Sequence, residues 1–118
     1  MSPPALKHFP KAQSTFQIPL IANENAFLGD IATSTDSDKP ISAGFYRLKK
    51  GTPLVYEYTY HEMKIILEGS FDISDEAGNK VHAVPGDVFY FPKGSKITFT
   101  TDDYGYAFYT GQRAEGAA

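Results

Sequence analysis

Polar side chains that could do chemistry together occupy every second position of one stretch, residues 54–68. Tyr56, Tyr58 and Tyr60 lead to the carboxylate of Glu62 and the ammonium of Lys64. Because the side chains of a β-strand alternate between its two faces, a strand here would place all of them on one face. Consecutive residues on one face lie roughly 6.6–6.8 Å apart, so the flexible ends of Glu62 and Lys64 can meet.

A carboxylate, an ammonium and phenol groups together suit proton abstraction next to a carbonyl group. Glu62 would be the base, and Lys64 with a hydroxyl of Tyr58 or Tyr60 would stabilise the oxyanion that develops. Elimination, isomerisation, decarboxylation and ring closure all pass through such a state. The reference pKa values of Glu, Tyr and Lys, about 4.3, 10 and 10.4, lie far from neutrality. A Schiff base on Lys64 would need a lowered pKa, for which the sequence gives no sign.

A plainer interpretation of the same stretch is structural. Tyrosines on strands usually fill cores or cover sheet edges, and an isolated Glu/Lys pair is usually solvated. If Glu62 and Lys64 face water, only a small β domain without a site remains. The two interpretations therefore differ in one observable, which is whether this pair lies inside the molecule.

The composition of the chain excludes several classes of protein. The 118 residues suffice for one domain. The absence of cysteine excludes disulfide scaffolds, thiolate zinc sites, iron–sulfur clusters and cysteine nucleophiles. A net charge of −3 argues against nucleic acid as a partner, and no apolar run is long enough to span a membrane. We expect a cytoplasmic protein whose partner is a small molecule.

The aromatic residues, glycines and prolines of the chain predict an all-β fold. Nine phenylalanines and eight tyrosines favour pleated sheets, and ten glycines with eight prolines favour turns between short strands. We expect no helix. The predicted organisation is a flexible N-terminal arm (1–14), a single domain (15–111) and a C-terminal tail (112–118). The predicted strands are 15–20, 26–33, 41–48, 54–68, 71–74, 80–83, 88–91, 96–101 and 104–110.

Two glycine motifs, in order, resemble those of the cupin family. Residues 62–69 have the pattern E-x₆-G, and residues 86–94 have the pattern G-x₅-P-x-G. More narrowly, the segments 60–69, 85–95 and 109–113 resemble the EutQ-like cupins of the ethanolamine-utilisation type. The chain carries His61 where that group usually has aspartate. The resemblance implies a cupin fold, a conical β-barrel or double-stranded β-helix jelly roll of two antiparallel sheets.

The cupin resemblance also bears on metal binding. Many cupins hold a transition metal on three histidines and a glutamate. In this chain Glu62 keeps the glutamate position. The paired histidine positions fall on Tyr56 and Tyr58, or on Val55 and Glu57 in the longer-spaced variant of the motif, and the third falls on Ile97. We therefore predict no metal and no cofactor. The alternative is a metal enzyme that uses Glu62 with tyrosine ligands.

The resemblance places the ligand in the mouth of the barrel. Catalysis is assigned to Glu62, Lys64, Tyr58 and Tyr60. Substrate binding is assigned to Tyr56, Ile97, Phe99 and Tyr106, with Tyr109 as an alternative to the last. Besides a metal-independent lyase, isomerase, decarboxylase or cyclase, the resemblance allows an accessory protein that only binds a small ligand. Bacterial members are linked to acetate phosphorylation, which we do not carry over because the chain lacks a G-x₄-G-K-[S/T] loop.

The other face of the stretch 54–68 predicts a homodimer. Met63, Ile65 and Leu67 form an apolar row that one small barrel does not readily cover. The alternative is that the second sheet covers this row.

Overall fold

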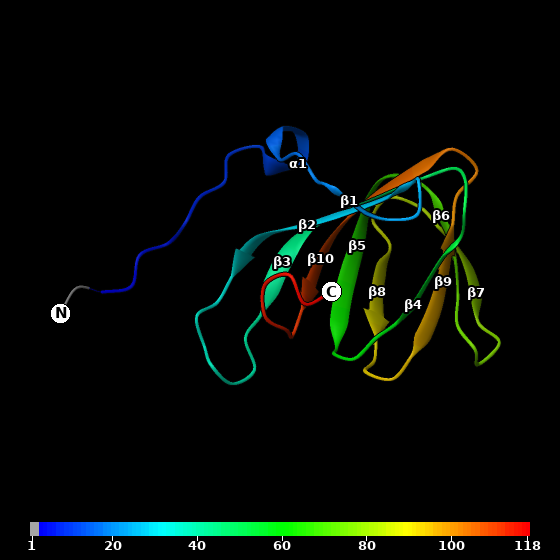
Figure 1. The fold of residues 1–118 in the computed structure, drawn as a ribbon. Helices are drawn as coiled ribbons and strands as arrows, with labels where there is room; N and C mark the ends of the chain where they lie inside the picture. The colour runs from blue at the N-terminus through cyan, green and yellow to red at the C-terminus, as the bar shows by residue number, and fades with distance from the viewer. Residues whose placement is uncertain (1–2) are drawn as a thin grey trace.

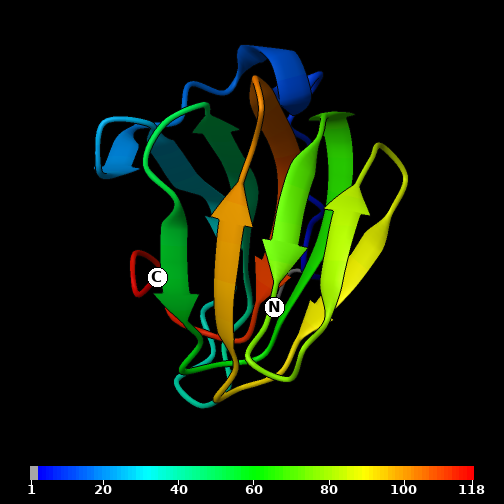
Figure 2. The ribbon, with the colours of Figure 1, turned by 90° about the vertical axis from the view of Figure 1, so that its right-hand side faces the viewer.

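Two antiparallel sheets face each other in the computed structural model, which describes residues 3–118 (Figures 1 and 2). The larger sheet has the strand order β1 (Leu20–Ala22), β2 (Ala26–Thr33), β3 (Ser42–Lys49), β10 (Tyr104–Gly111), β5 (Glu62–Gly69) and β8 (Val88–Phe91). The smaller sheet has the order β4 (Leu54–Glu57), β9 (Lys96–Thr100), β6 (Phe71–Ser74) and β7 (Lys80–Ala83). The prediction of an all-β fold with two antiparallel sheets is confirmed.

The core between the sheets is largely aromatic. Tyr46 of the larger sheet stacks on Phe71 of the smaller one, with 5.6 Å between ring centroids. Phe99 contacts both Tyr46 and Phe91 edge to face, at 5.4 and 5.6 Å. Rings of this size fill the roughly 10 Å between facing sheets. This explains how a chain rich in phenylalanine and tyrosine builds its core.

The stretch 54–68 is not one strand, and that part of the sequence prediction is wrong. β4 pairs with β9 in the smaller sheet, whereas β5 lies between β10 and β8 in the larger sheet. The connection crosses from one sheet to the other, held by hydrogen bonds from the Tyr58 amide to the Ser95 carbonyl and from the Gly94 amide to the Tyr58 carbonyl. The alternation of buried and exposed residues nevertheless continues through the crossing, so Tyr58 and Tyr60 stay buried.

Gly69 marks the end of β5 because no other residue fits there. Its φ is +65°, and a Cβ at this position would lie 2.1 Å from the carbonyl oxygen of Tyr104. The positive φ and the close approach of a neighbouring backbone both require glycine. The glycine that ends the first motif is therefore a structural requirement of the corner.

The N-terminal region contains a short helix that the sequence prediction missed. α1 (Ala12–Thr15) replaces the start of the expected strand 15–20, of which only Leu20 is in β1. The helix lies against the larger sheet, where the Tyr106 hydroxyl donates to the Gln13 carbonyl at 3.0 Å. Residues 3–9 have no regular structure and extend away from the sheets (Figure 1). Residues 1–2 of the predicted arm lie outside the described part.

The outer surface of β5 and β8 carries an exposed apolar patch. Met63 pairs with Tyr90 and Ile65 with Val88, and their exposed fractions are 55%, 53%, 36% and 70% respectively. We call these four residues the outer apolar patch. The smaller sheet packs on the opposite face of β5, so it does not cover the patch, and Leu67 is half-buried. In residues 3–118, no helix has the length and apolar character needed to cross a membrane.

Candidate functional site

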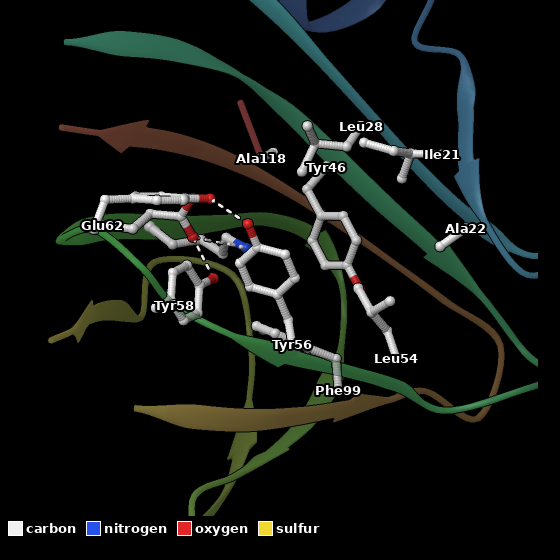
Figure 3. Close-up of a pocket in the computed structure, with 12 residues that line it drawn as sticks. Ile21, Ala22, Leu28, Tyr46, Leu54, Tyr56, Tyr58, Glu62, Phe99 and Ala118 are labelled. Carbon is white, nitrogen blue, oxygen red and sulfur yellow. Dashed lines mark hydrogen bonds and ion pairs between the residues drawn. The ribbon is translucent and has the colours of Figure 1, made fainter. Parts of the chain in front are cut away.

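A cavity of about 180 Å³ lies between the two sheets (Figure 3). Its lining comes from β1 to β5, β9, the crossing between β4 and β5, and the C-terminal segment. One part of the lining is aliphatic and the other part is polar and aromatic. The lining residues are Ile21, Ala22, Leu28, Tyr46, Leu54, Tyr56, Tyr58, Tyr60, Glu62, Lys64, Phe99 and Ala118.

Glu62 and Lys64 form a buried ion pair at the polar end of this cavity. Their side chains are only 2% and 3% exposed, and Lys64 Nζ lies 3.4 Å from Glu62 Oε2. The Tyr58 hydroxyl donates a short hydrogen bond to the same oxygen. Figure 3 shows the polar ends of Glu62 and Tyr58 directed toward one another between the sheets. The interpretation of the pair as a solvated surface feature is therefore wrong.

Aromatic rings surround the Lys64 ammonium. Nζ lies 4.3 Å from the ring centroid of Tyr46, 4.7 Å from that of Phe99 and 5.6 Å from that of Phe91. Such contacts favour a cation, but they replace little of its lost hydration. Burial lowers the pKa of Lys64, and the negative charge of Glu62 opposes this only in part. The lowered pKa that the sequence could not reveal is thus a property of the folded chain.

The hydroxyls of Tyr58 and Tyr60 in the cavity keep their protons. Burial raises the pKa of Tyr58 well above its usual value, and the neighbouring Glu62 charge raises it further. Burial and the hydrogen bond with Tyr56 also raise the pKa of Tyr60. The Tyr56 and Tyr60 hydroxyl oxygens are 3.0 Å apart, so one hydroxyl donates to the other. The hydroxyl that accepts this bond retains its own proton for a ligand.

The residues at the site do not fit the metal that cupins often carry. Glu62 is the only carboxylate side chain among the described residues that line the cavity, and phenols that keep their protons, such as that of Tyr58, are poor ligands for divalent transition metals. Ile97, at the third histidine position, has no donor atom. Within residues 3–118 no cluster of three or more His, Cys, Asp or Glu side chains is placed to hold a metal ion.

Two of the predicted substrate-binding residues line the cavity and two do not. Tyr56 and Phe99 contribute to its wall. Ile97 is buried on the same strand as Phe99, but it lines a separate space with Ile73 and Phe91. Tyr106 stacks on Phe45 on the outer side of the larger sheet, at 5.5 Å.

The displacement of Tyr106 follows from strand alternation. Tyr106 and Tyr109 are three residues apart on β10, so their side chains lie on opposite faces. Tyr109 pairs with Lys64 and takes the inner face. Its ring centroid lies 6.0 Å from Lys64 Nζ. From the sequence, either tyrosine could face the cavity. The choice between them requires the pairing register of β10 with β5, which the sequence does not reveal.

A second buried network links the C-terminal segment to the cavity. Arg113 donates to both oxygens of Asp30, at 2.8 and 2.9 Å, and the Tyr109 hydroxyl donates to Asp30 at 2.6 Å. The Gly116 amide also donates to Asp30. Burial alone would raise the pKa of Asp30, but these hydrogen bonds lower it to about 2. The network folds residues 112–118 back, so that Ala118 reaches the cavity wall.

The part of the cavity wall that β1, β2 and β3 contribute was not predicted from the sequence. Tyr46 comes from β3, Leu28 from β2 and Ile21 from β1. The alternation of small or apolar residues along residues 42–48 signals a buried face on β3, but it does not show what that face meets.

Comparison with known proteins gives the same fold and a family. The family model described as "Ethanolamine utilisation protein EutQ" matches residues 22–117. A curated relative from Clostridioides difficile (strain 630), named acetate kinase EutQ, is 32% identical over 89 residues, which are 75% of this chain and 55% of that protein. The chain therefore spans about half the length of this relative.

Solved structures agree. The structure of the Clostridium difficile EutQ protein matches with a TM-score of 0.65 and 30% identity, covering 75% of this chain and 68% of that one. An RmlC-like cupin from Shewanella frigidimarina matches with a TM-score of 0.71 and 17% identity, over 94% of this chain and 95% of that one. The predicted cupin fold is confirmed, and the chain belongs to the EutQ family.

Proposed function

We propose that this EutQ-family cupin is a metal-independent acid–base enzyme that removes a proton next to the carbonyl group of a small metabolite. The observation that carries the proposal is the buried Glu62–Lys64 pair, which opens into a cavity together with phenol donors. Moving two charges out of water costs roughly several kcal/mol per ion, so a buried ion pair is seldom retained for packing alone. A few polar groups that converge in an aromatic pocket are typical of a small-molecule site.

Glu62 is the proposed general base. Both of its contacts, with Tyr58 and with Lys64, use Oε2. Among the hydrogen bonds of residues 3–118, none involves Oε1, so this oxygen is available to accept the proton from carbon. The Tyr58 hydroxyl holds the carboxylate in place through the other oxygen. Glu62 thus combines a fixed orientation with a free acceptor.

Lys64 and the Tyr56–Tyr60 hydroxyl pair are the proposed stabilisers of the oxyanion. The pair leaves one hydroxyl proton free, and the ammonium supplies a positive charge in a largely dehydrated space. Donors that are fixed before the reaction stabilise developing negative charge more strongly in such a space than in water. The substrate oxygen would therefore point to this end of the cavity.

The shape of the cavity limits the substrate. A volume of about 180 Å³ admits a molecule of a few heavy atoms beyond the carbonyl group. Ile21, Leu28 and Leu54 line the end away from Glu62, as Figure 3 shows. We therefore expect a short aliphatic carbonyl compound rather than a highly charged one.

The test is the exchange of α-hydrogens for deuterium, followed by NMR on a panel of short aldehydes, ketones and keto acids. We expect catalysed exchange with at least one compound, and a loss of about 10²–10⁴-fold in Glu62→Gln. Glu68→Gln is the matched control, because Glu68 lies on the same strand outside the cavity and bonds to Gln13. Equal exchange by Glu62→Gln and the wild type would contradict the proposal.

The alternative is an accessory protein that only binds such a ligand. Saturable NMR shifts of cavity residues without any exchange would favour it. The acetate kinase activity in the relative's name has less support here. Lys64 is the one cationic side chain that lines the cavity within residues 3–118, and it is already paired, whereas phosphoryl transfer requires several positive groups around the phosphates.

A further inference from the structure

The environment of Lys64 differs from that of every other lysine in residues 3–118. Lys64 is buried, whereas the remaining lysines of this part of the chain are all exposed. Its ammonium has three protons, but its one polar partner among these residues is Glu62, at 3.4 Å. The rings of Tyr46 and Phe99 occupy much of its remaining surroundings. An amine held in this way loses less on becoming neutral than a solvated one, and the neutral form has the lone pair of a nucleophile.

We propose that Lys64 forms a covalent imine with a short aliphatic aldehyde in the cavity. The inference rests on the proposed function in that a carbonyl compound must enter the same space. It goes beyond that function because Lys64 then bonds to the substrate carbon instead of only stabilising its oxygen. Nothing in the sequence pattern or the family match assigns this role.

The step balances without an oxidant or a reductant. The lone pair of the Lys64 amine forms a bond to the carbonyl carbon, and the C=O π electrons move to oxygen. That oxygen takes a proton from the Tyr56–Tyr60 hydroxyl pair, while the nitrogen gives a proton to Glu62. The nitrogen lone pair then forms the C=N bond, and the C–O bond breaks. Glu62 returns its proton to the leaving oxygen, and the iminium nitrogen gives its remaining proton back to the Tyr56–Tyr60 hydroxyl pair. One aldehyde and one amine thus give one imine and one water, and every protein group regains its starting protonation state.

The distances around Lys64 and Glu62 support the proton transfers in this step. Glu62 Oε2 is 3.4 Å from the nitrogen that must lose a proton, and Oε1 has no competing hydrogen bond within residues 3–118. The aliphatic wall of Ile21, Leu28 and Leu54 lies where the alkyl chain of the aldehyde would extend. The lowered pKa of Lys64 adds to this geometry, since more of the amine is neutral near pH 7.

The experiment is reductive trapping with propanal as the probe. The full chain is incubated with propanal and sodium cyanoborohydride at pH 7, and peptide mass mapping locates the added propyl groups. We expect Lys64 to react faster than exposed Lys96, by up to about tenfold for each unit by which its pKa is lowered. Preferential labelling of exposed lysines, or no labelling of Lys64, would overturn the proposal.

Two variants, together with the α-hydrogen exchange assay, distinguish a failure of the imine proposal from a failure of the proposed function. Lys64→Met removes the nucleophile, and Glu62→Gln/Lys64→Met does so without leaving an unpaired buried charge. Both should lose the specific label, while Lys96→Met should retain it. If α-hydrogen exchange persists but Lys64 is never labelled, the imine is refuted and the proposed function stands. If neither exchange nor labelling occurs, both are refuted.

Discussion

Replacing Glu62 with glutamine should make the stability of this protein depend on pH more strongly than that of the wild type, because the Glu62 charge partly opposes the lowering of the Lys64 pKa. The substitution keeps the shape of the side chain and a hydrogen-bond acceptor for Tyr58, but it removes the counter-charge of Lys64. Breaking a buried pair by removing one partner typically costs about 3–5 kcal/mol. The lysine can limit this loss by releasing its proton.

The free-energy cost of releasing this proton follows from the reference pKa of lysine and sets an upper bound on the loss of stability. Starting from about 10.4, a lysine that becomes neutral at pH 7 costs about 4.6 kcal/mol, and at pH 9 about 1.9 kcal/mol. The folded-state pKa is lowered, so the unfolded state binds more protons and stability rises with pH towards the unfolded pKa. The variant should therefore regain up to about 2.7 kcal/mol between pH 7 and pH 9. Tyr46 and Tyr58 have raised pKa values, so they stay neutral over this range.

The assay is urea unfolding of Glu62→Gln at pH 7 and pH 9. With an m value of about 1–3 kcal/mol/M, a full recovery would move the midpoint by roughly 1–2.7 M. The control is Glu62→Gln/Lys64→Met, which has no buried charge at this site and should show no such gain. We expect this double variant to be at least as stable as the wild type at pH 7, because an apolar side chain of similar length replaces the ammonium. An equal loss in Glu62→Gln at both pH values would refute the reasoning.

The remaining predictions concern other parts of the molecule. Acid unfolding should show the loss of about 2 kcal/mol between pH 4 and pH 2, because in this range Asp30 binds a proton in the unfolded state but stays largely ionised in the folded state (pKa about 2). Asp30→Asn should remove this step. Light scattering should give a homodimer through the outer apolar patch, and Met63→Lys should give the 13.0 kDa monomer. A monomeric wild type would contradict the dimer. Elemental analysis of protein purified without chelator should find far less than one transition-metal ion per chain, whereas a stoichiometric metal that is lost in Glu62→Ala would reverse our interpretation of the site.

The proposed catalytic half of the site was predictable from the sequence because it depends on a local rule. Alternation along an extended chain depends only on backbone geometry, so it holds from Tyr56 to Lys64 although the stretch is two strands in two sheets. The corner at Gly69 was equally predictable, since its positive φ is a local requirement that glycine meets, although the close approach of the Tyr104 carbonyl is a contact between distant segments. For this reason the side chains of this stretch that share the interior can be identified from the sequence alone.

The tertiary structure alone decided what that interior contains. The choice of Tyr109 over Tyr106 beside Lys64 depends on the pairing register of β10 with β5, and the place of Ala118 depends on the contact between Asp30 and Arg113. The dehydration that lowers the pKa of Lys64 comes from rings on β3, β8 and β9, up to 35 residues away along the chain. These properties arise from contacts between distant segments. The alternation of residues within one segment shows which of its faces is buried, but it does not show which other segment packs against that face.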